Sequence, residues 1–96
     1  MVKVTFDEKE QYEEKLDRVV FRANIGDRQL RCVITHKTIE AHFASPGAPH
    51  MRTQTCMDMF AKHRTAIHAS ARRMISEIGE NDLEVTSEIV LSPSFM

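Results

Sequence analysis

Apolar residues recur at helical spacing over residues 52–78, a stretch that contains neither glycine nor proline. They are separated by three, four or seven positions and therefore share one stripe of a helix: Cys56, Phe60, Ile67, Ala71, Met74 and Ile78. Thr53 or Thr55 can begin this helix and Gly79 can end it. The pattern predicts one long unbroken helix.

Two apolar runs between residues 18 and 35 flank a Gly-Asp pair and predict a β-hairpin. Gly26 at the first central position suits a two-residue type II′ turn. This turn pairs apolar residues on one face, namely Ala23 with Leu30, Phe21 with Cys32 and Val19 with Ile34. The other face pairs Asn24 with Gln29, Val20 with Val33 and Arg22 with Arg31. Because two facing arginines repel each other, we expect an acidic side chain beside them.

The remaining patterns complete a four-stranded sheet. Residues 2–6 and 84–91 alternate as strands, and the charged residues 7–17 form a loop or short helical turn anchored by Tyr12 and Leu16. Thr35 can cap a short helix over residues 36–44, in which Ile39 and Phe43 form the buried pair. We therefore predict a single α+β domain over residues 1–96, with a four-stranded, largely antiparallel sheet packed on one long helix, plus one short helix.

Composition and charge exclude some classes of protein. The net charge of −1 argues against a protein that holds nucleic acid by bulk positive charge. The apolar stretches are too short to span a membrane, and the N-terminus lacks the features of a secretory signal. We therefore expect a cytoplasmic protein.

Core and capping positions carry a family resemblance over roughly residues 2–91: Val19-Val20-Phe21, Cys32-Val33-Ile34-Thr35 with Ile39 and Phe43, Phe60-Ala61-Lys62-His63-Arg64 with Ile67, and Ile89-Val90-Leu91. With these residues the chain resembles a family of small uncharacterised bacterial proteins, domain of unknown function 1488. The resemblance implies a compact α+β domain and carries over no catalytic residue.

Histidine and cysteine residues suggest little specific chemistry. No histidine pair has the spacing that places two metal ligands on one helix face, so we expect no metal and no cofactor. His63 is either an interior histidine with local partners or a pH-sensitive group. An enzyme built on His63 and Cys56 is a distant third hypothesis, because neither Cys56 nor Cys32 has a neighbouring base in the sequence.

Four arginines form the candidate anion-binding set: Arg22 and Arg31 on the outer sheet face, and Arg64 and Arg72 on the helix. They can hold an anion or nucleic acid. Alternatively, Glu13, Glu84, Glu88 or other acids pair with them.

The helix also offers an interaction surface. A helix of about 27 residues extends about 40 Å, whereas strands of this length reach about 20–27 Å, so one end overhangs the sheet. This end carries Met51, Met57, Met59 and Phe60. Either a partner covers it, or Tyr12, Phe43 and the loop at residues 45–49 do so. We predict a non-enzymatic module that forms a homodimer or binds a protein partner there.

Overall fold

The hairpin of β3 (Arg18–Ile25) and β4 (Arg28–Thr35) lies at the centre of the sheet in this computed structural model, which describes residues 3–7, 9–43, 53–78, 82 and 85–91. Every pair predicted for the hairpin is observed, including Phe21 with Cys32 and Arg22 with Arg31. Gly26 has a φ of 58°, whereas Asp27 has a negative φ, which agrees with the type II′ turn. The prediction of this hairpin is therefore confirmed.

The described sheet is mixed and has five strands rather than four. Both β1 (Val4–Phe6) and β2 (Gln11–Glu13) pair antiparallel with β3, one after the other along one edge, and β5 (Glu88–Leu91) pairs parallel with β4. The stretch predicted as a loop or helical turn thus contains β2, followed by the 3₁₀-helix η1 (Glu14–Leu16). The last strand begins at Glu88 rather than at residue 84, and Val85 is exposed.

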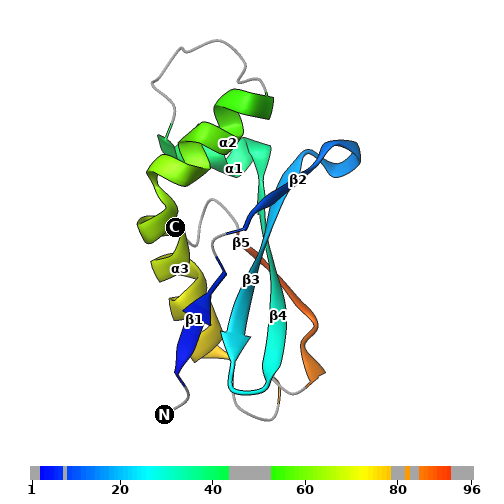
Figure 1. Ribbon diagram of the computed structural model, residues 1–96, viewed down its shortest axis with the longest axis vertical. Helices are drawn as coiled ribbons and strands as arrows, with labels where there is room; N and C mark the ends of the chain where they lie inside the picture. The colour runs from blue at the N-terminus through cyan, green and yellow to red at the C-terminus, as the bar shows by residue number, and fades with distance from the viewer. Residues whose placement is uncertain (1–2, 8, 44–52, 79–81, 83–84, 92–96) are drawn as a thin grey trace.

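The prediction of one unbroken helix is wrong, because the segment forms two helices, α2 (Thr53–Lys62) and α3 (Arg64–Glu77). They meet at His63, whose φ of −108° and ψ of 19° depart from helical values. Local hydrogen bonding continues across the break, since His63 N donates to the oxygens of Met59 and Phe60. Figure 1 shows α2 crossing the end of the sheet at a steep angle to α3, which runs beside β1 and the hairpin.

The break allows each half of the segment to pack on a different neighbour. The helix α2 contacts α1 (His36–Phe43), while α3 carries Ile67, Ala71 and Ile75 into the core against the sheet. The His63 ring stacks on Phe43 at the end of α1, with ring centroids 4.2 Å apart. A straight helix cannot make both sets of contacts, so the end expected to overhang the sheet folds over α1 instead.

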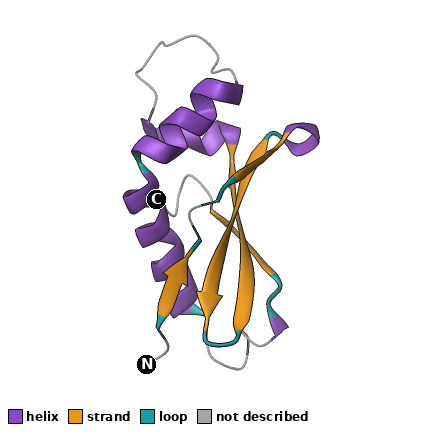
Figure 2. Cartoon of the chain, in the orientation of Figure 1, coloured by secondary structure: helices purple, strands orange, loops and turns teal. Residues whose placement is uncertain are grey.

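The core lies between the α-helices α1, α2 and α3 and one face of the sheet, which we call the inner face (Figure 2). On this face Val19, Phe21 and Ile34 are fully buried, and they pack with Phe60 and Ile67 from the helices. The predicted cap of α1 is also present, since Thr38 N donates to Thr35 Oγ1 over 3.2 Å. None of the described helices is long and apolar enough to cross a membrane.

Candidate functional site

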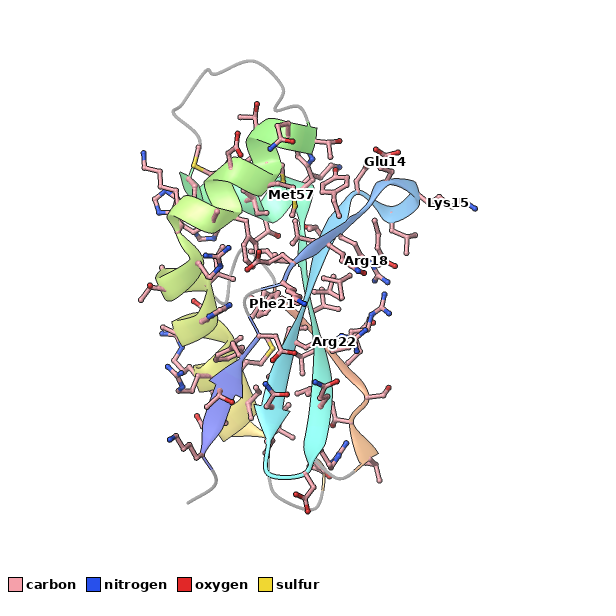
Figure 3. The ribbon with its side chains drawn as sticks, in the orientation of Figure 1. Glu14, Lys15, Arg18, Phe21, Arg22 and Met57 are labelled. Carbon is pink, nitrogen blue, oxygen red and sulfur yellow. The ribbon has the colours of Figure 1, made fainter. Side chains whose placement is uncertain are left out.

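The outer face of the sheet, which points away from the core, carries a row of three valines on neighbouring strands. Val20 lies opposite Val33, and Val33 lies opposite Val90, so the row crosses β3, β4 and β5. Figure 3 shows Phe21 on the helix side of β3 and Arg22 on the other side, as the alternation of a strand requires. The valine row is therefore separate from the main core.

Four charged side chains, which we call the ion cluster, cross the valine row: Glu13, Arg18, Arg31 and Glu88. Glu13 and Arg18 lie on one side of the row, with Glu13 Oε1 2.5 Å from Arg18 Nε. Arg31 and Glu88 lie on the other side, with Arg31 Nε 2.9 Å from Glu88 Oε2.

Two contacts join the charged residues on the two sides of the valine row. Glu13 accepts hydrogen bonds from Arg31 Nη2 at both carboxylate oxygens, each over 2.9 Å, and Arg18 Nη1 lies 3.7 Å from Glu88 Oε1. The ion cluster thus spans the row above Val20 and Val33, which are buried, while Val90 at the end of the row is 48 % exposed.

The sequence predicts an acidic partner for the facing residues Arg22 and Arg31, and one of the two arginines has it. Arg31 contacts Glu13 and Glu88, whereas no described carboxylate lies within salt-bridge distance of Arg22. The hydrogen bond from Arg18, followed by that from Arg31, lowers the pKa of Glu13 below its ordinary value of 4.5. Glu84, the third acid considered, lies outside the described residues.

The other two candidate arginines belong to the helical layer. Arg64 forms a two-point ion pair with Glu10, with Nε 2.6 Å from Oε1 and Nη2 3.0 Å from Oε2. The Arg72 guanidinium lies 5.3 Å from the centre of the Phe6 ring. The structure therefore does not bring the four arginines together, and anion binding by this set stays a prediction.

The predicted interaction surface is divided by the fold. Phe60 is completely buried against Phe21, with ring centroids 5.4 Å apart, and is a core residue. Met57 and Met59 are half-buried, and they flank the buried stripe on opposite sides of α2 because two helical positions are separated by about 200°. Met51 lies outside the described residues. The three described residues of the set, Met57, Met59 and Phe60, therefore do not form one continuous exposed apolar patch.

Both cysteines are buried and reduced. Burial raises the pKa of Cys56 to about 11, with a further contribution from the Glu40 carboxylate, and burial raises the pKa of Cys32 to about 12. A thiol with such a pKa is a poor nucleophile at neutral pH, since the thiolate is the reactive form. The helix dipole near the start of α2 does not overcome this burial.

We therefore expect Cys56 to resist alkylation by iodoacetamide in the folded protein at pH 7. With a pKa of about 11, only on the order of one thiol in ten thousand is ionised at that pH. Mass-spectrometric peptide mapping measures the rate, with protein unfolded in urea as the reference. Rapid labelling of Cys56 before unfolding contradicts this assignment.

The sequence interpretation missed a polar network around the buried His36. His36, at the start of α1, has Nδ1 2.7 Å from the Tyr12 hydroxyl and Nε2 2.7 Å from Glu40 Oε1. The spacing of four between His36 and Glu40 on a helix was the available signal, but Tyr12 joins them only through the fold. Among the described residues, no three His, Cys, Asp or Glu side chains are placed to hold a metal ion.

Comparison with known proteins agrees with this architecture. A crystal structure of a protein of unknown function from the DUF1488 family of Shewanella loihica PV-4 is similar to the chain, with a TM-score of 0.68, 18 % identity and 90 % of each chain covered. No curated protein matches the chain. The family model described as protein of unknown function (DUF1488) matches residues 4–85. Since this match covers most of the sequence, the chain belongs to the DUF1488 family.

Proposed function

We propose that the chain is a small, non-enzymatic module that self-associates through the outer face of its sheet, with Val90 at the centre of the contact. The observation that carries the proposal is the half-exposed Val90 beside the buried Val33, on the face opposite the described helices. An apolar side chain surrounded by partly exposed charged groups has the anatomy of a protein interface.

The charges around Val90 favour a second copy of the chain as the partner. The ion cluster has two acids and two bases, so its formal charge is zero and a second copy is not repelled. A two-fold axis through this face can place Glu88 of one copy near Arg31 or Arg22 of the other. A self-complementary surface of this kind favours a homodimer over a strongly charged partner.

The chemistry of the interior supports a non-enzymatic role. The raised pKa values keep Cys32 and Cys56 as thiols at neutral pH. Both ring nitrogens of His36 already lie within 2.7 Å of protein oxygens, and a general base needs a nitrogen that faces its substrate.

The test compares two exposed valines in sedimentation experiments over a range of protein concentrations. Val90→Asp places a charge at the proposed contact, and we expect it to raise the dimer dissociation constant at least about tenfold, because an unpaired charge is costly to bury. Val85→Asp is the matched control, since Val85 is 83 % exposed and lies outside the described strands. It should leave the dimer unchanged.

The remaining outcomes count against the proposal. A strict monomer at high micromolar concentration excludes self-association, and equal weakening by both valine variants excludes a specific role for Val90. If Met59→Glu dissociates the dimer and Val90→Asp does not, the contact lies on α2, where the sequence first placed it.

A further inference from the structure

The strand β5 has backbone groups that its pairing with β4 does not use. The strand order ends at β5, and within the part of the chain that the structure describes no strand pairs with its far edge (Figure 1). Arg31 N donates to Ser87 O over 3.4 Å, so the backbone of Ser87 points toward β4. Because the N–H and C=O groups of successive residues point to opposite sides of a strand, those of Glu88 and Val90 point away from β4. This edge therefore presents two donors and two acceptors.

The side chains of the same two residues lie on the outer face of the sheet. Val90 continues the valine row beside Val33, and Glu88 lies opposite Arg31, whose Nε is 2.9 Å from Glu88 Oε2. One end of the edge is thus apolar, and the other end carries a charge that is neutralised within the chain. The unpaired backbone of a strand edge is a template for another strand, and the side chains decide which strand and which register fit.

We infer that a second copy of the chain adds its own β5 antiparallel to this edge, about a two-fold axis that passes between the two Val90 residues. The inference rests on the self-association proposed above and specifies its geometry, in which the two sheets join edge to edge and their outer faces form one surface. The two Val90 residues then exchange a pair of backbone hydrogen bonds. The valine row continues from one copy into the other.

Charge and burial select this register over the two others that Glu88 and Val90 allow. On the inner face it places Ile89 opposite Leu91 of the second copy, and both are core residues. Pairing Glu88 with Glu88 would place like charges opposite each other, and pairing Glu88 with Val90 would place a charge opposite an apolar group. In the register centred on Val90, the two Glu88 residues are four positions apart. This separation is about 14 Å along the strands, a distance at which salt screens their repulsion.

Amide hydrogen exchange at Val90, followed by NMR over a range of protein concentrations, tests the inference. The Val90 N–H points away from β4 in the single chain and toward a carbonyl oxygen in the joined sheet. Its exchange should therefore slow at least about tenfold as the dimer forms. The N–H of Ile89 faces β4 in both states and is the internal reference. If sedimentation shows a dimer but exchange at Val90 does not slow, self-association stands and the edge-to-edge geometry is overturned, whereas a strict monomer overturns both.

Two variants of Val90 separate edge pairing from packing between outer faces. Val90→Pro removes the N–H that faces the second copy but keeps an apolar side chain, and an edge strand tolerates proline where its nitrogen is outside the ladder. Val90→Thr keeps the N–H and the branched shape but replaces a methyl group with a hydroxyl. Edge pairing predicts that Val90→Pro raises the dimer Kd at least about tenfold and Val90→Thr less than about threefold. The reverse order overturns the inference.

Circular dichroism shows whether Val90→Pro is folded. If this variant does not fold, the exchange at Val90 in the natural chain decides between the two geometries.

Discussion

Phe60→Ala is expected to lower the free energy of unfolding by about 3–5 kcal/mol, the usual cost of removing a buried aromatic ring. The Phe60 side chain has no exposed surface and packs edge-on against Phe21, with an interplanar angle of 62°. The loss is a large share of the roughly 5–15 kcal/mol that stabilises a domain of this size. Urea unfolding followed by circular dichroism measures it.

A variant of Met59 tests whether the loss of stability in Phe60→Ala comes from the burial of Phe60 in the core. Met59→Ala, next to Phe60 but only half-buried, should cost about 1 kcal/mol, because less of its side chain leaves water on folding. If Phe60→Ala instead retains full stability and only dissociates a dimer, Phe60 belongs to an interaction surface, as its place in the sequence suggested.

The second large effect is expected for Arg64→Ala, with a loss of about 2–3 kcal/mol. The Glu10 side chain is only 8 % exposed, and Arg64 neutralises it through two contacts. Removing one partner of a buried pair costs about 3–5 kcal/mol, and we reduce this value because Arg64 is 31 % exposed. Urea unfolding at neutral pH is again the measurement.

An arginine on the exposed side of the same helix provides the matched control. Arg73→Ala should lower stability by no more than about 1 kcal/mol, because solvent weakens any interaction at an exposed position. Replacing both Arg64 and Glu10 with apolar or neutral residues, as in Arg64→Met with Glu10→Gln, should recover most of the loss, because no unpaired buried charge remains. Equal losses in Arg64→Ala and Arg73→Ala contradict the importance of the buried pair.

The strands show which elements can be predicted from the local pattern of apolar residues. The hairpin was predictable because Gly26 selects the turn, and the alternation of apolar residues permits only one register. The strand β2 was not predictable, because its three residues contain only Tyr12 as an apolar position and are surrounded by charges. It forms because the exposed edge of β3 pairs with it, a contact between segments that periodicity does not describe.

The break between α2 and α3 at His63 shows a second limit of prediction from the sequence. The apolar stripe continues in phase from Cys56 and Phe60 to Ile67 and Ala71, so the sequence on both sides is compatible with one helix. What bends the chain is the competition between packing on α1 and packing on the sheet, with Phe43 stacked on His63 at the junction. The two packing partners, α1 and the sheet, are formed by segments outside residues 52–78. The periodicity of this stretch therefore does not reveal the break.

The sequence by itself determined the α+β class, the hairpin register and the apolar stripe, because each depends on neighbouring residues and on the period of one element. The tertiary structure alone decided which charges meet and which apolar groups are covered. Arg31 and Arg64 are paired with Glu13 and Glu10, Phe60 is buried and Val90 is half-exposed. The physical reason is that electrostatic pairing and burial depend on distances between elements, and those distances are set only when the sheet, its fifth strand and the broken helix pack together.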